Sequence, residues 1–289
     1  MIDAHLHLWK VQNGRVDGKP VFSVGNGKSN FGGRIVQMMP AYMTDGANTA
    51  ERLLSCMDFA QVSAAVVTQE YIDGNQDAYL KEVRATWPER FRVTALYEEN
   101  GVPDLSGADG IKICGGRLAD PDLTHHASVF AAADEAGKFI SIDMAEGDTQ
   151  VGSLRELIRQ YPDLRIAIGH FGMVTVPGWE EQIRLAREPN VRIESGGITW
   201  LFNSEFYPYP SAVNAILRAR DLCGMDKLMW GSDYPRTMTA ITYRMSWDFV
   251  DKSPLLSPEE KQLFFHQNAQ TFYRFENLPE MPYVHHMAE

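Results

Sequence analysis

The sequence predicts a single α/β domain folded as a (β/α)8 barrel, the TIM-barrel class. Short apolar runs alternate with amphipathic stretches along most of the chain, which is typical of βα units arranged around a parallel sheet. The 289 residues are an ordinary length for one such barrel, and a hydrophobic content of 44% provides a large core. A doubly wound open sheet is the alternative architecture.

The order of apolar and amphipathic segments predicts the following elements. Strands are expected at residues 1–5, 64–68, 92–96, 110–113, 139–143, 165–168, 191–194 and 227–231. Helices are expected at 48–59, 75–87, 127–136, 151–161, 179–187 and 211–222, whereas 97–108 is too short and polar for one. We expect the barrel to occupy residues 1–275 and residues 276–289 to form a C-terminal tail.

Helix-start signals support several of these elements. Ser257-Pro258-Glu259-Glu260 combines a capping serine, a first-turn proline and a carboxylate three residues after the serine. The helix that begins there, continued through 268–275, is expected to close one end of the barrel. Thr149, Pro177 and Pro210 stand where caps or first-turn prolines belong.

The segment 10–47 after the first strand is the exception to compact alternation. It holds seven glycines and shows no clear periodicity, so we predict a long loop. Loops of this length inside a domain are usually functional or disordered. Because it follows a strand, it is expected on the carboxyl-terminal face of the barrel, where active sites of this fold lie.

Composition restricts the partners of the protein. A net charge of −11 disfavours nucleic acid and anionic membranes, although a local basic cluster still permits a small anionic substrate. Cys56, Cys114 and Cys223 are too few and too scattered for a disulfide framework and fit a cytoplasmic protein. No apolar run is long enough for a membrane span, and the first residues do not read as a signal peptide. Homo-oligomerisation stays open.

His5 and His7 lie two residues apart on the first predicted strand. Residues at this spacing point to one face of an extended strand, which in a barrel is the interior. Two neutral imidazoles facing one cavity can bind a divalent cation such as zinc or manganese. The alternative is a pair of hydrogen-bonded core histidines, but imidazole is costly to bury without partners.

Asp233 follows the last apolar strand and precedes Tyr-Pro, so its carboxylate is held at a strand end. It is a candidate metal ligand or a general base that takes a proton from water. A turn-forming or capping role is the alternative. The presence of His5 and His7 favours the functional role.

Two further candidates end neighbouring strands. His170 follows the run 166–169 and could polarise a substrate carbonyl or bind metal, the alternative being a structural histidine. Asp143 ends the fifth strand and could be an additional metal ligand, or it could cap the following turn. Glu70, Glu98 and Glu194 also end candidate strands, and the sequence does not rank them.

Three cations are placed to hold the carboxylate of a substrate. Lys112 lies within the fourth strand, Arg117 in the loop beyond it, and Arg236 just after the Asp-Tyr-Pro step. Arginine suits a two-bonded grip on a carboxylate. Each of the three could instead be an ordinary solvated charge.

These motifs together resemble the amidohydrolase superfamily, in its amidohydrolase-related branch of lactonases and decarboxylases. The matching pieces are Ile2-Asp3-Ala4-His5-Leu6-His7-Leu8-Trp9, Gly169-His170-Phe171-Gly172, Ser195-Gly196, Gly231-Ser232-Asp233-Tyr234-Pro235 and Asn268-Ala269. The resemblance implies a barrel with His5, His7 and Asp233 in the active site and His170 beside them. Trp9 resembles the sugar-acid lactonases, and the Asp-Tyr-Pro ending is shared with the decarboxylases.

The chain departs from the family pattern at one position. Relatives usually have a histidine at the end of the fifth strand, where this chain has Asp143. Lys112 lacks the surroundings of a carbamylated lysine that bridges two metals, so the resemblance implies at most one divalent metal ion, with zinc expected. Some lactonases of this branch act without metal, so metal-independent catalysis stays open.

Three functions follow as hypotheses. The first is a hydrolase that opens a sugar-acid or other carboxylated lactone by attack of an activated water. The second is a metal-dependent decarboxylase of an aromatic or unsaturated acid. The third is a barrel that binds a ligand without catalysis.

Overall fold

Eight parallel strands form the barrel that the sequence predicts. The computed structural model describes residues 1–281. The strands follow one another around the barrel in chain order, so each strand pairs with the barrel strand that precedes it in the sequence. They are β1 (Ile2–Leu6), β6 (Ala64–Val67), β7 (Phe91–Leu96), β8 (Gly110–Ile113), β9 (Phe139–Ile142), β10 (Arg165–Ile168), β11 (Val191–Glu194) and β12 (Leu228–Met229).

The segment that follows β12 closes the barrel against β1. The amide of Ala4 donates to the carbonyl of Trp230 at 2.8 Å, and the amide of Asp233 donates to the carbonyl of His5 at 2.9 Å. The amide of His7 then donates to the carbonyl of Tyr234, also at 2.9 Å. The strand predicted at 227–231 is therefore shorter in the structure, where β12 has two residues. The residues after β12 nevertheless make backbone hydrogen bonds to β1.

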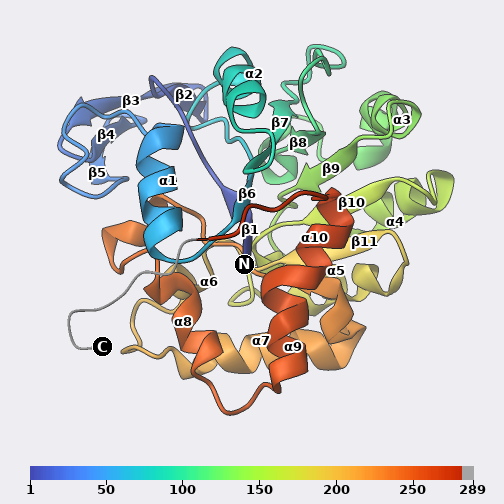
Figure 1. The fold of residues 1–289 in the computed structure, drawn as a ribbon. Helices are drawn as coiled ribbons and strands as arrows, with labels where there is room; N and C mark the ends of the chain where they lie inside the picture. The colour runs from blue at the N-terminus through green and yellow to red at the C-terminus, as the bar shows by residue number, and fades with distance from the viewer. Residues whose placement is uncertain (282–289) are drawn as a thin grey trace.

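Helices surround the strands (Figure 1). As predicted, β7 and β8 are connected without a helix. The helices are α1 (Ala50–Phe59), α2 (Asp77–Thr86), α3 (Ala127–Glu135), α4 (Val151–Gln160), α5 (Trp179–Arg184), α6 (Ile198–Leu201), α7 (Pro210–Cys223), α8 (Met245–Asp251), α9 (Pro258–Gln262) and α10 (Asn268–Tyr273). No helix of the described residues is long and apolar enough to cross a membrane.

The predicted C-terminal helix closes the amino-terminal end of the barrel. It starts at the capping box formed by Ser257 and Glu260, continues through a π-helical turn at Leu263–Gln267 and ends in α10. Figure 1 shows α10 beside the start of β1. Its apolar side chains complete a separate buried cluster with the strand starts, made of Ile2, Ala4, Ala64, Val66, Phe139, Ala167, Met229, Ala269, Phe272, Tyr273 and Phe275.

Of the other predicted helix starts, only that at Pro210 is confirmed, because Pro210 is the first residue of α7. The residue that caps α4 is Gln150 and not Thr149, and Gly178 stands between Pro177 and α5. Residues 276–281 of the predicted tail contain no helix or strand, and 282–289 lie outside the described residues.

Residues 10–47, for which we predicted a long loop, contain regular secondary structure. The segment folds into a four-stranded antiparallel sheet of β2 (Asn13–Val16), β3 (Lys19–Gly25), β4 (Lys28–Phe31) and β5 (Arg34–Gln37), which lies beside α1 (Figure 1). We call it the accessory sheet. Its base is closed by the paired backbones of Trp9 and Asn48.

Two-residue turns explain why the accessory sheet forms. Its strands are joined at Asp17-Gly18, Asn26-Gly27 and Gly32-Gly33, and both residues of each pair have positive φ. This backbone matches the twist of a β-hairpin, and these pairs are its preferred sequences. The glycines that made the segment look like a loop are therefore the hairpin signals.

The buried carboxylate of Asp3 fastens β1 to the chain after β12. It accepts hydrogen bonds from the amides of His5 (3.2 Å) and Ser232 (2.9 Å) and from the hydroxyl of Tyr243 (2.8 Å). Because Asp3→Ala leaves these buried donors unpaired, we expect the free energy of unfolding to fall by about 3 kcal/mol. Urea denaturation measures this.

The exposed cap provides the comparison for that measurement. Ser257→Ala removes one capping hydrogen bond and should cost about 1 kcal/mol. A loss for Asp3→Ala no larger than that for Ser257→Ala would contradict the role given to Asp3 in closing the barrel.

Candidate active site

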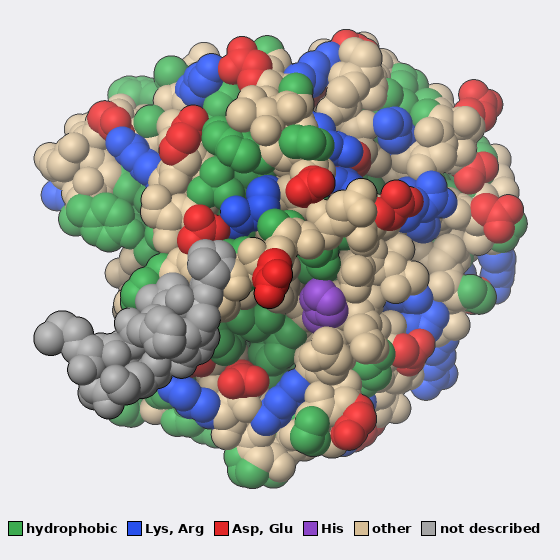
Figure 2. Space-filling model, in the orientation of Figure 1, with side chains coloured by type: hydrophobic (Ala, Val, Ile, Leu, Met, Phe, Trp, Pro, Cys, Tyr) green, Lys and Arg blue, Asp and Glu red, His purple; other side chains and the backbone are tan. Residues whose placement is uncertain are grey.

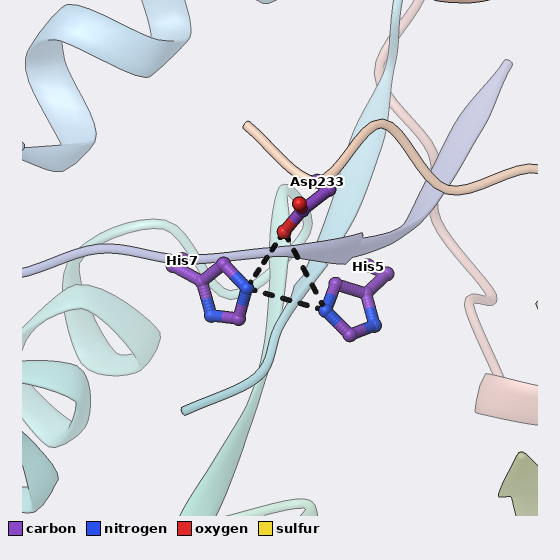
Figure 3. A group of neighbouring side chains, drawn as sticks. All are labelled: His5, His7 and Asp233. Carbon is purple, nitrogen blue, oxygen red and sulfur yellow. Dashed lines mark hydrogen bonds and ion pairs between the residues drawn. The ribbon is translucent and has the colours of Figure 1, made fainter. Parts of the chain in front are cut away.

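Side chains from opposite ends of the chain meet at the carboxyl-terminal mouth of the barrel (Figure 3). Nε2 of His7 lies 3.2 Å from Nε2 of His5 and 3.0 Å from Oδ1 of Asp233, and Nε2 of His5 lies 3.9 Å from the same oxygen. All three residues are at most 2% exposed. One ligand atom from each converges on a common point, so the group can hold a metal ion.

Glu194 at the end of β11 fixes the ring of His5. Its Oε1 lies 2.5 Å from Nδ1 of His5, and its Oε2 accepts the amide hydrogen of Gly196 at 2.5 Å. A carboxylate at Nδ1 keeps the proton on that nitrogen, which leaves the lone pair of Nε2 facing His7 and Asp233. Histidines that bind metals are usually oriented in this way.

Glycines make this close arrangement sterically feasible. A Cβ atom on Gly231 would lie 2.8 Å from Cβ of His5 and 2.9 Å from Oε2 of Glu194. A Cβ atom on Gly196 would lie 2.9 Å from Cγ of His5. Any larger residue at either position would displace the imidazole or the carboxylate that orients it.

Asp233 is held from both sides of its carboxylate. Besides the contact of Oδ1 with His7, its Oδ2 accepts a hydrogen bond from Nε1 of Trp200 at 2.7 Å. The residue has a φ of 57°, an uncommon conformation that is often retained at functional sites.

The charges of this group suit metal binding. Burial, together with the positive charge of Arg236, lowers the pKa of His7 to about 4. Burial alone would raise the pKa of Asp233, but the hydrogen bond from His7 and the charge of Arg236 outweigh it and lower that pKa. At neutral pH the imidazole of His7 is neutral and the carboxylate of Asp233 is ionised, which are the forms that bind metals.

A second group of side chains lies next to the first. Oδ2 of Asp143 is 2.6 Å from Nζ of Lys112 and 3.5 Å from Nε2 of His170, whose Nδ1 donates to the carbonyl of Gly196 at 2.8 Å. Burial lowers the pKa of His170, but the charge of Asp143 outweighs it and raises the pKa to about 10. His170 is therefore an imidazolium at neutral pH.

These groups open into one cavity of about 420 Å³. Glu70 lines it with Arg117, whose Nε lies 3.5 Å from Oε2 of Glu70. Burial and the negative charge of Asp143 raise the pKa of Glu70. The lining residues are His7, Glu70, Ile72, Cys114, Gly116, Arg117, Asp143, Met144, Ala145, Glu146, Gly169, His170, Gly172, Met173, Gln182, Trp200, Asp233 and Arg236.

The structure brings together most of the residues that the sequence proposed. His7, Asp143, His170, Asp233, Arg117 and Arg236 line the cavity, with His5 directly behind His7. Asp143 groups with His5 and His170 and not with the pair of His7 and Asp233. Lys112 is fully buried, is not among the residues that line the cavity, and directs its ammonium at Asp143.

Three residues of the site were not singled out from the sequence. Glu194 and Glu70 were seen only as unranked residues at strand ends, although that position was the signal. A carboxylate at the end of a strand that neighbours the histidines could have been weighted more heavily. Trp200 lies on the short α6, and no pattern in the sequence marks it.

On the face seen in Figure 2, Lys and Arg side chains are interspersed with Asp and Glu side chains. Arg117 and Arg236 are cations that line the cavity.

Comparison with known families assigns the chain to one of them. The family model described as "Amidohydrolase" matches residues 2–275. The chain belongs to the amidohydrolase family. The resemblance inferred from the motifs is thereby confirmed.

Among curated relatives, this amidohydrolase is 28% identical over 173 residues to L-fucono-1,5-lactonase of Burkholderia ambifaria, which covers 55% of this chain and 57% of that protein. The chain spans about half the length of the curated relatives it matches.

Solved structures share the fold of this amidohydrolase. A probable 2-pyrone-4,6-dicarboxylic acid hydrolase of Acinetobacter baumannii, solved with citric acid bound, superposes with a TM-score of 0.71 at 18% identity, covering 95% of this chain and 99% of that one. An amidohydrolase of Burkholderia multivorans with bound zinc gives a TM-score of 0.69 at 16% identity, covering 96% and 99%. Eight parallel strands in a nearly closed barrel are thus confirmed by the structure and by these neighbours.

The charge of His170 can be tested in this amidohydrolase without a substrate. Since Asp143 stabilises the protonated ring, the pKa of His170 lies above its ordinary value, and this contribution to stability is present at neutral pH and lost as pH rises through about 10. In Asp143→Asn we expect the pKa of His170 to fall, because its strongest stabilising charge is lost while the burial that lowers the pKa remains. Imidazole NMR spectra of the metal-free parent and variant between pH 5 and 11 measure both pKa values. An unchanged titration of His170 in the variant would contradict this pairing.

Proposed function

We propose that the protein is a hydrolase that opens the ring of a small carboxylated lactone by attack of water on the carbonyl carbon. The observation that carries the proposal is the convergence of His5, His7 and Asp233 at a cavity that also presents the imidazolium of His170. The similarity to a lactonase and to a pyrone-dicarboxylic acid hydrolase supports a cyclic ester as the substrate.

We propose that His5, His7 and Asp233 hold one divalent cation, with zinc favoured. The donor set fits zinc, since two imidazole nitrogens and one ionised carboxylate oxygen face one point. Glu194 supplies the orienting contact behind His5. A cation there lowers the pKa of water and polarises a carbonyl. That Asp143 is a further ligand stays a prediction. Its carboxylate already lies next to two cations, Lys112 and His170, and this competes with binding of a metal ion.

The chain's own groups account for the proton and charge transfers. A bond forms between the water oxygen and the carbonyl carbon while Asp233 accepts the proton of the water at its carboxylate. His170 faces the cavity with a positive charge and stabilises the negative charge that develops on the carbonyl oxygen. The ring C–O bond then breaks, and the proton held by Asp233 passes to the ring oxygen. The product is an open-chain hydroxy acid.

We propose that Arg117 and Arg236 bind the carboxylate that the substrate carries outside its reacting ester. Both line the cavity, and both side chains are partly exposed, at 38% and 16%. Lys112 in our proposal acts through Asp143, whose orientation in turn keeps His170 charged.

Removing the proposed base tests this function. In Asp233→Asn the side chain keeps its size but cannot accept the proton, so we expect lactone turnover to fall by about a thousandfold. The assay follows acid release from a panel of carboxylated and sugar lactones, with hydroxybenzoates as the set that reveals decarboxylation. The exposed Asp148→Asn, outside the cavity lining, is the matched control and should keep the activity of the parent.

The outcomes of this assay separate the hypotheses. Turnover by Asp233→Asn within tenfold of the parent, with an unchanged unfolding midpoint, would remove Asp233 from its role. Carbon dioxide release from hydroxybenzoates without lactone opening would favour the decarboxylase. A parent protein that is inactive on both sets would favour a barrel that only binds its ligand.

A further inference from the structure

A chain of buried hydrogen bonds runs from the accessory sheet to the cavity. The hydroxyl of Ser29 donates to Oε1 of Gln12 at 2.6 Å, and Nε2 of Gln12 donates to Oδ1 of Asp73 at 3.0 Å. The other carboxylate oxygen of Asp73 accepts a hydrogen bond from Nη2 of Arg236 at 2.6 Å. Four side chains from four separate segments are thereby joined in one line that ends at the active site.

The burial of this chain makes its geometry restrictive. Ser29 is fully buried, and Gln12 and Asp73 are each 2% exposed. Buried polar groups must find partners, and hydrogen bonds are stronger where water is excluded. Each of these three side chains forms hydrogen bonds with its neighbours in this series. Moving one of them would therefore leave the next without its partner.

Arg236 has donors left for a ligand. Asp73 occupies Nη2, whereas Nη1 is buried without a hydrogen-bond partner among the described residues and lies 3.9 Å from Oδ1 of Asp233. Guanidinium groups bind carboxylates through pairs of parallel N–H bonds, which requires a fixed orientation of the plane. Asp73 sets the orientation of that plane by holding one edge.

The accessory sheet and its flanks hold the remaining parts of this arrangement. Backbone bonds from Asn13 to Asp73 and from Arg15 to Tyr71 attach β2 to the loop that carries Asp73. The ring of Trp9 lies 5.9 Å from the guanidinium carbon of Arg236, within the range of a cation–π contact. The indole nitrogen of Trp9 donates to the carbonyl of Gly46, at the far end of the same segment.

We propose that the accessory sheet positions Arg236 for recognition of a carboxylate on the substrate, with Ser29, Gln12 and Asp73 as positioning residues. The inference rests on the proposed function in one respect, that Arg236 binds the substrate's carboxylate. It extends that function, because it makes the accessory sheet, which lies outside the barrel, responsible for the preference for a charged lactone over a neutral one.

Gln12→Met is the main test, because methionine has a similar length but makes neither hydrogen bond of the amide. We expect KM for a carboxylated lactone to rise about tenfold with kcat changed less than twofold, the effect of losing an interaction equal in the ground and transition states. KM for a neutral sugar lactone should not change. The dissociation constant of glutarate, a dicarboxylate probe measured by calorimetry, should rise by the same factor.

Val21→Ala is the matched control for general weakening of the sheet. Val21 is a fully buried residue of β3 that takes no part in the hydrogen-bond chain. The substitution leaves a cavity and lowers stability, but it should leave KM and glutarate affinity unchanged. An equal rise of KM in Val21→Ala and Gln12→Met would overturn the proposal, since it would show that sheet stability alone is responsible.

A double-mutant cycle tests whether Gln12 acts through Arg236. In the Arg236→Met background, Gln12→Met should have no further effect on KM or on glutarate affinity. An undiminished effect there would contradict the proposal, as would a parent protein that does not bind glutarate. Glutarate results that match expectation in a protein that opens no lactone would overturn the proposed reaction alone. Lactone opening that is insensitive to Gln12→Met would overturn the positioning role alone.

Discussion

The active site depends on the parallel contact between β1 and the chain that follows β12. The backbone bonds from Asp233 to His5 and from His7 to Tyr234 fix the register of the first and last strands at their carboxyl ends. That register brings Nε2 of His5, Nε2 of His7 and Oδ1 of Asp233 to within 4 Å of one another, although Asp233 lies more than two hundred positions from the two histidines. The constraint that closes the barrel is therefore the same one that assembles the candidate metal site.

A second constraint is the pairing of charge in a buried space. Uncompensated charges are too costly to bury, and the most deeply buried charges of the site lie next to groups of opposite charge. Asp143 lies between Lys112 and His170, whereas Arg236 lies between Asp73 and Asp233. This leaves an ionised carboxylate on one side of the cavity and an imidazolium nearby, the polarity required for attack of water on an ester.

The sequence predicted the barrel and the central residues because both follow from strand position. Alternating apolar runs located the strands, and His5, His7, His170 and Asp233 stand at strand ends, where this fold places its chemistry. The accessory sheet was missed because glycine content was weighed above the Asn-Gly turn of its hairpins. The pairing of Lys112 with Asp143 and the hydrogen bonds that join Gln12, Asp73 and Arg236 were not foreseen, because side-chain pairings between distant segments leave no local pattern.

Diffraction from crystals soaked in zinc, recorded on both sides of the zinc absorption edge, tests the central claim most directly. If the three side chains hold the ion, one strong anomalous peak is expected about 2.1 Å from Nε2 of His5, Nε2 of His7 and a carboxylate oxygen of Asp233. Zinc-saturated crystals whose anomalous peaks all lie away from these three side chains, or that show no peak, would contradict it.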